Sequence, residues 1–323
     1  MQTITADILK KVIHQRPQNS FKGTFGKVLI VGGNPNMGGA AIMAGSAAVH
    51  AGAGLVTIAT ARENLTAVHS VIPEAMFVDY QDAPQFISLI KGVDVIVLGP
   101  GLGNDSIAEK VIQTVFTNIA SNQTLIIDGS AITLVAQNAA LKDAIPTNAH
   151  VVYTPHQMEW QRLSEIPISE QNNTHRNQEA QQSLNATVIL KKHHSEIYFS
   201  NGEIRKLMVG GPAMATGGMG DTLTGILAAF IAQFDASFED RIQAAVFTHS
   251  KITDKLAEEK LWIKNKTVNL HGFIFTLISI MLEFHFQKGD GIGRVLEMNQ
   301  TSTAPSQSGS ALPHVCRTPQ TSA

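Results

Sequence analysis

Residues Lys27–Val31 read KVLIV, and residues Gly32–Pro35 directly after them read GGNP, a turn signal. Short runs that are rich in Val and Ile and apolar on both faces are typical of buried strands in a parallel sheet. Helix-length stretches such as Gly39–Ala51 and Ile107–Ala120 separate these runs. The alternation predicts an α/β fold, a layered, mainly parallel sheet with flanking helices. The other runs of this kind are Leu55–Ala59, Asp94–Leu98, Thr124–Ile127, His150–Tyr153 and Thr187–Leu190.

Two further elements follow in the C-terminal half of this pattern. Glu196–Ser200 and Glu203–Leu207 are joined at Asn201-Gly202, the preferred pair for a two-residue turn, and therefore predict a hairpin. After Asp221, apolar residues recur at helical spacing, which predicts a helix with one face on the sheet. These residues are Leu223, Ile226, Leu227, Phe230 and Ile231.

The composition excludes several classes of protein. The chain has 323 residues, of which 44% are hydrophobic and 15% charged, so a sizeable core is expected. Its formal net charge of −2 gives no drive toward nucleic acid or an anionic membrane, and neither is expected as a partner. The single cysteine, Cys316, excludes an intrachain disulfide framework and a cysteine-based zinc cluster. Met1–Pro17 lacks the apolar core of a secretory signal, so a cytoplasmic location is expected.

The chain is expected to have three regions. Residues 1–262 carry the strand and helix alternation and are predicted to form one domain. Residues 263–298 are an atypical apolar segment, in which Gly272–Leu282 is an uncharged run of 11 residues. Because a bilayer needs about 20 residues, a buried helix or strand is favoured over a span. Residues 299–323 are rich in Ser, Thr, Pro and Gln, which predicts disorder.

The strongest local signal for chemistry is Ala215–Asp221 (ATGGMGD), which runs into the predicted helix after Asp221. Glycines allow close approach of backbone N–H groups, and a helix N-terminus adds unpaired donors and partial positive charge. Such a turn suits phosphates, and in phosphoryl transfer an aspartate accepts the proton of an attacking hydroxyl. The alternative, that Asp221 only caps the helix and the glycines only form a turn, stays open from spacing alone.

Two more glycine-rich loops follow strands, at Gly32–Gly39 and Gly99–Gly103. The first lacks both the Lys-Ser/Thr ending of a P-loop and the G-x-G-x-x-G spacing of a dinucleotide fold. Each could be only a tight turn between a strand and a helix. Because the three glycine-rich loops all lie at strand ends, a shared ligand crevice is predicted.

Polar residues also follow the predicted strands. His156 and Glu159 meet on one face if a helix begins there, with His156 as a substrate contact and Glu159 organising metal or water. The alternative for His156 is a structural role, which is more frequent for a lone histidine at a strand end. Asp128 is a candidate near the phosphates, and an Asx turn is its alternative. Lys191 could bind a nucleotide phosphate, with a solvated basic cluster of Lys191–His194 as the alternative.

Residues 20 to about 260 resemble the ADP- or ATP-dependent NAD(P)H-hydrate dehydratases of the ribokinase-like superfamily. The resemblance rests on an ordered set of motifs: Lys22–Gly33, Gly38–Ala40, Ala51–Val56, Gly99–Gly103, Thr154–His156 with Glu159, and Ala215–Asp221. It implies a lyase that repairs hydrated NADH and NADPH (NADHX and NADPHX). The ring hydroxyl is phosphorylated, phosphate leaves, and the double bond reforms. Bacterial members generally use ADP, yield AMP and phosphate, and bind Mg²⁺ with the nucleotide.

The resemblance also implies roles for individual residues. Asp221 matches the catalytic base, and the N–H groups of Gly218 to Gly220 match the anion hole. Glu159 is a candidate for metal, and a homotetramer is expected. The hydrated dinucleotide is expected at Ala40, Gly103, His156 and Asp221. The adenine nucleotide is expected at Lys191, Lys192, His193, His194, Ser195 and Gly220.

The chain departs from the family pattern in several places. Lys191-Lys192 followed by two histidines replaces the usual Lys-Gly, and Gln157-Met158 replaces Pro-Gly. Beyond Leu261 nothing resembles the family. Two other functions stay open, a ribokinase-like small-molecule kinase for a vitamin-precursor alcohol and a catalytically silent nucleotide-binding protein.

Overall fold

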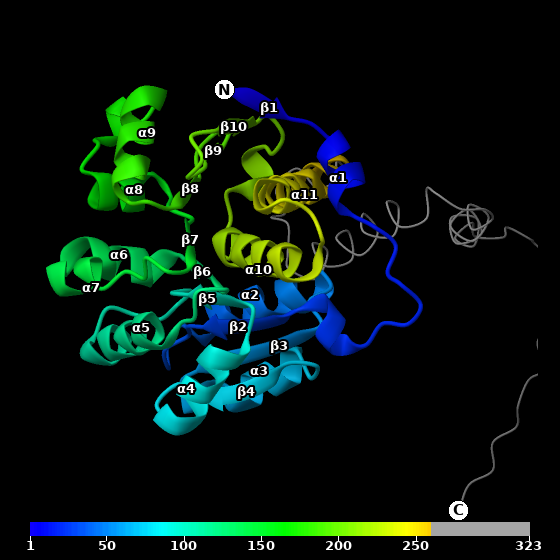
Figure 1. Cartoon of the computed structure of the whole chain (residues 1–323), viewed down its shortest axis with the longest axis vertical. Coiled ribbons are helices and arrows are strands. Elements are labelled where there is room, and N and C mark those ends of the chain that lie inside the picture. The colour runs from blue at the N-terminus through cyan, green and yellow to red at the C-terminus, as the bar shows by residue number, and fades with distance from the viewer. Residues whose placement is uncertain (260–323) are drawn as a thin grey trace, which may run out of the picture. The chain divides into compact units, whose positions relative to one another are not determined.

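A ten-stranded sheet forms the centre of the protein in the computed structural model, which describes residues 1–259 (Figure 1). Its strand order is β1-β10-β9-β8-β7-β6-β5-β2-β3-β4, and β9 alone among these strands is antiparallel to its neighbours. The predicted layered, mainly parallel sheet is therefore confirmed. The strands are β1 (Gln2–Ile4), β2 (Lys27–Val31), β3 (Leu55–Thr60), β4 (Met76–Asp79), β5 (Val95–Leu98), β6 (Thr124–Ile127), β7 (His150–Tyr153), β8 (Thr187–Leu190), β9 (Glu196–Tyr198) and β10 (Ile204–Leu207).

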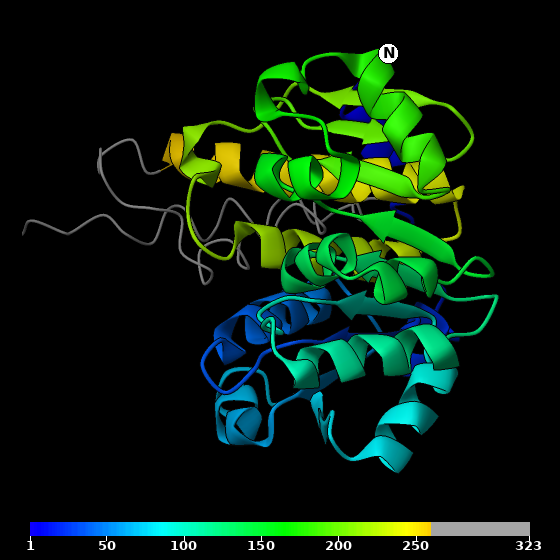
Figure 2. The ribbon, with the colours of Figure 1, turned by 90° about the vertical axis from the view of Figure 1, so that its left-hand side faces the viewer.

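Helices cover both faces of this sheet (Figures 1 and 2). One face, on the right of Figure 1, carries α1 (Asp7–Val12), α2 (Gly38–His50), α3 (Leu65–Val71), α10 (Met219–Gln233) and α11 (Phe238–Glu259). The other face carries α4 (Ala83–Gly92), α5 (Ser106–Asn118), α6 (Gly129–Gln137), α7 (Ala139–Asp143), α8 (Gln157–Ser164) and α9 (Thr174–Ser183).

The apolar strands bury alternate side chains in two separate cores. In β2, Val28 and Ile30 pack beneath α2 and α10, whereas Leu29 and Val31 pack on the opposite face. Successive side chains of a strand point to opposite faces, so a strand covered on both sides must be apolar throughout. This is why the six apolar runs could be recognised as strands.

The predicted strand boundaries agree closely with the structure. Four of the six runs match their strands residue for residue, while β3 extends one residue further, to Thr60. β5 begins at Val95, one residue later than the predicted run, and the carboxylate of Asp94 accepts a hydrogen bond from the Lys27 amide at 2.7 Å. β1 and β4 were not predicted, and both are short strands with exposed residues at their start.

The hairpin of β9 and β10 is confirmed, but its turn differs from the prediction. Phe199 donates to the Glu203 carbonyl at 2.9 Å, so the loop contains Ser200, Asn201 and Gly202. Of these three residues only Gly202 has a positive φ, of 87°. A two-residue type I′ turn needs positive φ at both central positions, whereas a three-residue loop needs it only at the last.

Helix α10 confirms the predicted apolar stripe, since all five of its residues are buried. The helix begins at Met219, two residues before Asp221, and it is also buried on its other sides. Small residues in α10 allow α2 and α11 to pack closely against it and to bury these sides of the helix. A Cβ on Gly225 would lie 2.1 Å from the Ala44 carbonyl oxygen of α2.

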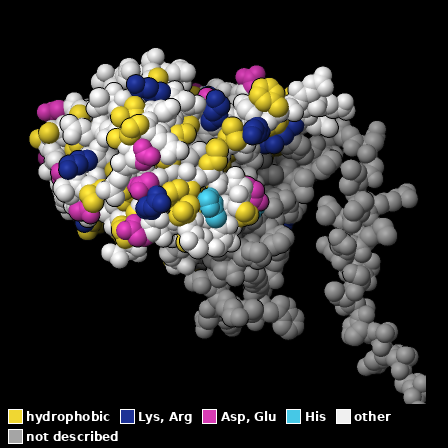
Figure 3. Space-filling model, turned by 90° about the horizontal axis from the view of Figure 1, so that it is seen from below, with side chains coloured by type: hydrophobic (Ala, Val, Ile, Leu, Met, Phe, Trp, Pro, Cys, Tyr) yellow, Lys and Arg dark blue, Asp and Glu magenta, His cyan; other side chains and the backbone are white. Residues whose placement is uncertain are grey.

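The predicted apolar segment 263–298 and tail 299–323 lie outside the described residues, so the predicted division at residue 262 stays a prediction. Among the helices within residues 1–259, none is long and apolar enough to cross a membrane. Charged side chains of both signs are interspersed on the face seen in Figure 3, in keeping with the near-neutral net charge.

Candidate active site

Three adjacent parallel strands bring polar side chains together at their carboxyl ends. Asp128 follows β6, Thr154 follows β7 and Lys191 follows β8. The Asp128 carboxylate is buried, and its Oδ1 accepts hydrogen bonds from Thr154 Oγ1 at 2.6 Å and from Lys191 Nζ at 2.7 Å. Asp128 precedes α6, but its side chain makes no capping hydrogen bond. Its carboxylate therefore binds the neighbouring strands and not its own turn.

The first turn of α10 meets this polar group. Gly218 is the N-cap residue with φ of 89°, a conformation that glycine adopts without strain. A Cβ built on Gly220 would lie 3.2 Å from Lys191 Nζ and 3.9 Å from Asp128 Oδ2. The glycine therefore allows the ammonium to approach the backbone at the positive end of the helix.

Asp221 lies in the first turn of α10, where no side-chain hydrogen bond caps the helix. The N-cap residue itself is Gly218, so the choice between Asp221 as a base and Asp221 as a residue that only favours the helix start stays a prediction. Burial, with the negative charge of Asp128 as a second cause, raises the pKa of Asp221 to about 7, and Lys191 opposes this shift. A carboxylate of this proton affinity is suited to accept a proton near neutral pH.

Lys191 remains charged in this site. Burial disfavours the ammonium, but Asp128 and Glu159 favour it, and the net pKa is raised. Its side chain is 21% exposed, so the ammonium pairs with the buried Asp128 and remains accessible from the open side of the site. The site thus has a fixed positive charge beside a carboxylate that can take up a proton.

His156 and Glu159 meet at the N-terminus of α8, as predicted. Glu159 Oε2 accepts from the His156 amide at 2.8 Å, and His156 Nδ1 accepts from the Met158 amide at 3.1 Å. Burial, followed by the charge of Lys191, lowers the pKa of His156, so its imidazole is neutral at pH 7. Burial raises the pKa of Glu159 to about 7.

The loop after β8 is not the solvated basic cluster that was the alternative. The Lys192 side chain is only 7% exposed, pairs with Glu196 at 3.0 Å and donates to the Gln171 carbonyl at 3.0 Å. The rings of His193 and His194 lie 3.9 Å apart, centroid to centroid. Lys192 therefore anchors the loop, and the two imidazoles remain beside the cavity.

A cavity of about 640 Å³ lies between this loop, the Val209–Gly220 segment and α11. His249 and Ser250 of α11 also line it, and the sequence had not indicated either residue. The predicted residues that line the cavity are His156, Lys191, Lys192, His193, His194, Ser195 and Gly220. The structure therefore brings the whole predicted nucleotide side together, although its binding role stays a prediction.

The other two glycine-rich loops pack against each other. The Gly33 amide donates to the Pro100 carbonyl at 2.8 Å, and the Asn34 amide donates to the Gly101 carbonyl at 2.7 Å. A Cβ on Gly101 would lie 2.9 Å from Cβ of Ala40 in α2. One turn further along α2, Met43 approaches Gly218. Helix α2 thus connects all three loops, which supports a shared crevice.

The predicted substrate residues lie at this junction. Ala40 is in the first turn of α2, and the Gly103 amide donates to Ser130 Oγ at 3.2 Å. Asn64 was missed, although its buried amide donates to the Gly33 carbonyl at 3.0 Å and to Thr60 Oγ1 at 2.8 Å. No spacing pattern marked Asn64, because its partners are 4 and 31 residues away.

The side chains of residues 1–259 form no metal cage. Within residues 1–259 there is no group of three or more His, Cys, Asp or Glu residues that could hold a metal ion. Both oxygens of Glu159 face His156, whose amide and imidazole they contact. Glu159 therefore binds the start of its own helix, and a metal role for Glu159 stays a prediction.

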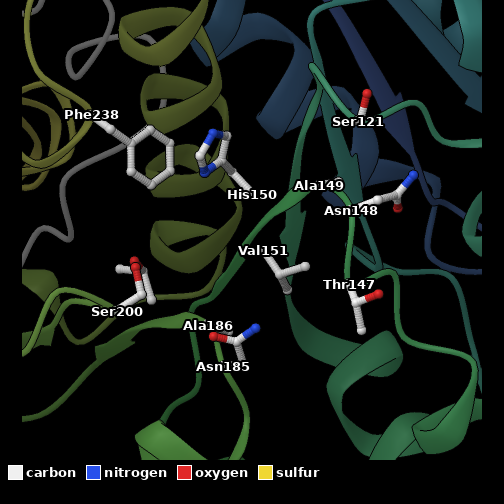
Figure 4. Close-up of a pocket in the computed structure, with 11 residues that line it drawn as sticks. Ser121, Thr147, Asn148, Ala149, His150, Val151, Asn185, Ala186, Ser200 and Phe238 are labelled. Carbon is white, nitrogen blue, oxygen red and sulfur yellow. The ribbon is translucent and has the colours of Figure 1, made fainter.

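A second cavity, of about 330 Å³, lies at the opposite ends of the strands (Figure 4). His150 begins β7, Asn148 precedes that strand, and Asn185 precedes β8. The imidazole of His150 lies 5.0 Å from the Phe238 ring. This cavity contains none of the predicted site residues. Those residues were predicted at the carboxyl ends of the strands, where ligands of such folds bind.

The fold and this site define a ribokinase-like α/β protein with an aspartate at a glycine-rich helix N-terminus. Residues 28–272 match the sequence profile of the NAD(P)H-hydrate dehydratases. The chain belongs to the NAD(P)H-hydrate dehydratase family.

Similar proteins agree with this assignment. The ADP-dependent (S)-NAD(P)H-hydrate dehydratase of Lactiplantibacillus plantarum is 46% identical over 257 residues, 80% of this chain and 90% of that protein. The Staphylococcus aureus protein of the same name is 45% identical, over 79% of this chain and 91% of that protein. The crystal structure of a ribokinase-like superfamily protein from Enterococcus faecalis is 42% identical, with a TM-score of 0.81, over 88% of this chain and 96% of that one.

Proposed function

We propose that this protein is an ADP-dependent dehydratase that restores NADH and NADPH from their hydrates and yields AMP and phosphate. The observation that carries the proposal is the placement of Asp221, a carboxylate with a pKa of about 7, in the first turn of a glycine-capped helix. The family to which the chain belongs supplies the substrate class.

The first step is phosphoryl transfer to the ring hydroxyl. Asp221 accepts the hydroxyl proton while that oxygen bonds to the terminal phosphorus of ADP, and the bond from phosphorus to the AMP oxygen breaks. The Lys191 ammonium and the N–H groups of Gly218 to Gly220 stabilise the negative charge on the transferring group. Neutral His156 is placed beside Lys191 to contact the bound ligands.

The second step is elimination. The bond from the ring carbon to the phosphate oxygen breaks, phosphate leaves with the electron pair, and the neighbouring ring carbon loses a proton to solvent. The ring double bond reforms, and the products are NADH or NADPH, AMP, phosphate and one proton. Phosphorylation promotes this step because phosphate is a far better leaving group than hydroxide.

A recovery assay tests the proposal. Purified protein is incubated with hydrated NADH, ADP and Mg²⁺, and the absorbance of restored NADH is followed together with AMP release. We expect NADH and AMP in equal amounts. Phosphorylation of a vitamin-precursor alcohol, with no NADH recovered, would instead identify the small-molecule kinase, and ADP binding without any turnover would identify a silent binding protein.

Three finer properties remain proposals. The preference for ADP over ATP follows from the names of the relatives and is measured by comparing kcat/KM for the two nucleotides. Dependence on Mg²⁺ is measured by titration with a chelator. A homo-oligomer, with a tetramer expected, is measured by light scattering.

A further inference from the structure

Asp128 is a buried carboxylate that the mechanism above does not use. It is 3% exposed, and its Oδ1 accepts both the Thr154 hydroxyl and the Lys191 ammonium. The three residues follow three neighbouring strands of the sheet. Its second oxygen, Oδ2, faces the first turn of α10, 3.9 Å from the position of a Cβ on Gly220.

Stability alone does not account for this pair. Removing a carboxylate and an ammonium from water costs about as much as their attraction returns, so apolar residues of similar size would serve a core equally well. The pair also lies at the end of the sheet where the ligand crevice is, and Lys191 lines the cavity of about 640 Å³. A role in the site explains the placement better than a role in the core.

The geometry restricts where the ammonium of Lys191 can lie. A lysine side chain is flexible and its charge is compact, so an unrestrained ammonium would occupy many positions along the cavity. The 2.7 Å contact with Asp128 holds Nζ at one position, 3.2 Å from a Cβ on Gly220. The Thr154 hydroxyl holds the carboxylate itself from the neighbouring strand.

The charges around Asp221 come from several elements. Asp128 lies at the end of β6 and Lys191 at the end of β8, and they shift the pKa of Asp221 in opposite directions. From α11, His249 packs near the same turn, and burial lowers the pKa of His249 to about 4, so it is neutral. Met43 of α2 approaches Gly218 and carries no charge. Three carboxylates face the Lys191 ammonium: Asp128, Glu159 of α8 and Asp221. Of the three, Asp128 makes the hydrogen bond that holds it.

We propose that Asp128 is a positioning residue, which holds the Lys191 ammonium against the first turn of α10 and away from a direct ion pair with Asp221. The inference rests on the proposed function, because it concerns the same site. It assigns Asp128 two effects: the ammonium is placed for the transferring phosphoryl group, and Asp221 remains a base of the required strength.

The test is the dependence of kcat/KM on pH for Asp128→Asn. Without the negative charge at position 128, the Lys191 ammonium is expected to pair with Asp221 and to lower the pKa of Asp221. The acidic limb of the kcat/KM profile is therefore expected to move about one pH unit lower. We also expect ADP binding, measured by calorimetry, to weaken by roughly tenfold, because the ammonium is no longer held. Circular dichroism and the unfolding midpoint confirm that the variant is folded.

Two matched variants separate charge from structure. Thr154→Val removes the hydroxyl partner of Asp128 but leaves the charge pair, so its acid limb is expected to stay in place. Asp128→Glu keeps the charge and is expected to restore the limb in part, even if Asp128→Asn folds poorly. In the double variant with Lys191→Met, Asp128→Asn is expected to add less than about a twofold further loss, since it acts through Lys191.

An unshifted acid limb in folded Asp128→Asn would overturn the inference. So would losses that multiply in the double variant, or full rescue of Asp128→Asn by raised Mg²⁺, which would assign Asp128 to a metal. If the wild-type protein does not restore NADH, the proposed function fails instead, and the calorimetric comparison of ADP affinity still decides whether Asp128 positions Lys191.

Discussion

The carboxylate of Asp221 experiences two opposed influences. A helix N-terminus favours a negative charge, whereas burial and the charge of Asp128 disfavour it. The result, a pKa of about 7, makes the group both partly ionised and basic at neutral pH. A surface aspartate would be fully ionised there and a far weaker base.

Removal of this base is expected to abolish turnover. Asp221→Asn keeps the size of the side chain, so we expect kcat to fall by at least about 10³-fold, while ADP affinity stays within a few fold. The recovery assay and calorimetry measure the two quantities. Turnover within tenfold of wild type would show that another group accepts the proton.

The pH profile follows from the same group. Because the base acts in its deprotonated form, kcat/KM of the wild-type protein is expected to rise with pH and level off above about 7. Glu159 also has a pKa of about 7, but its carboxylate caps α8. Glu159→Gln should therefore leave the limb within a few tenths of a unit, and a limb that disappears in this variant would assign the base to Glu159.

At the scale of elements, helix α10 depends on a close contact with α2. Gly225 lies against the Ala44 carbonyl, and the two backbones approach each other because glycine has no side chain. The same contact places the glycine-capped N-terminus of α10 beside the first turns of α2. The position of this N-terminus, where the anion site is predicted, is thus set by small residues on the buried side of a helix.

Gly225→Ala tests this packing. An added Cβ would lie 2.1 Å from the Ala44 oxygen, so the helices must separate, and we expect a loss of about 1–3 kcal/mol in the free energy of unfolding. Gly92→Ala in the last turn of α4 is the control. Nothing lies within 4 Å of a Cβ at Gly92, so its effect is expected to be neutral or slightly stabilising. Urea unfolding measures both, and equal effects would refute the packing explanation.

At the scale of the whole molecule, the site reduces the stability of the fold. A carboxyl whose folded pKa is raised contributes stability that is complete below its unfolded pKa, here 3.8, and is lost as pH rises through about 7. Asp221 therefore destabilises the folded chain most above pH 7. The proposed role of Asp221 as a base requires this unfavourable charge, and the two cores on either side of the sheet tolerate it.

Asp221→Asn is thus expected to stabilise the protein while inactivating it. We expect a gain of roughly 1–3 kcal/mol in the free energy of unfolding near pH 8, which disappears near pH 4. Urea unfolding of both proteins at the two pH values measures it. A gain that does not change with pH would show that the carboxylate is not destabilised by burial.

The strands that are covered on both faces could be predicted from the sequence, because their apolar pattern is local. β1 could not, because it has three residues and pairs in parallel with β10, two hundred residues away along the chain. The turn at Asn201-Gly202 was placed correctly but its type was not, since pairing of Phe199 with Glu203 adds a residue to the loop. Glycine-rich loops and strand-end polar residues were likewise visible as local patterns.

The order of apolar and glycine-rich segments by itself determined the layered parallel sheet and the carboxyl edge at which a ligand is predicted to bind, because both follow from side-chain alternation and turn chemistry along the chain. Only the tertiary structure decided that Asp128, Thr154 and Lys191 form one hydrogen-bonded group against the tip of α10. Their separations of 26 and 63 residues carry no periodic signal. Burial by segments that are distant in the sequence then sets the pKa of Asp221, so this pKa depends on the tertiary packing around the carboxylate.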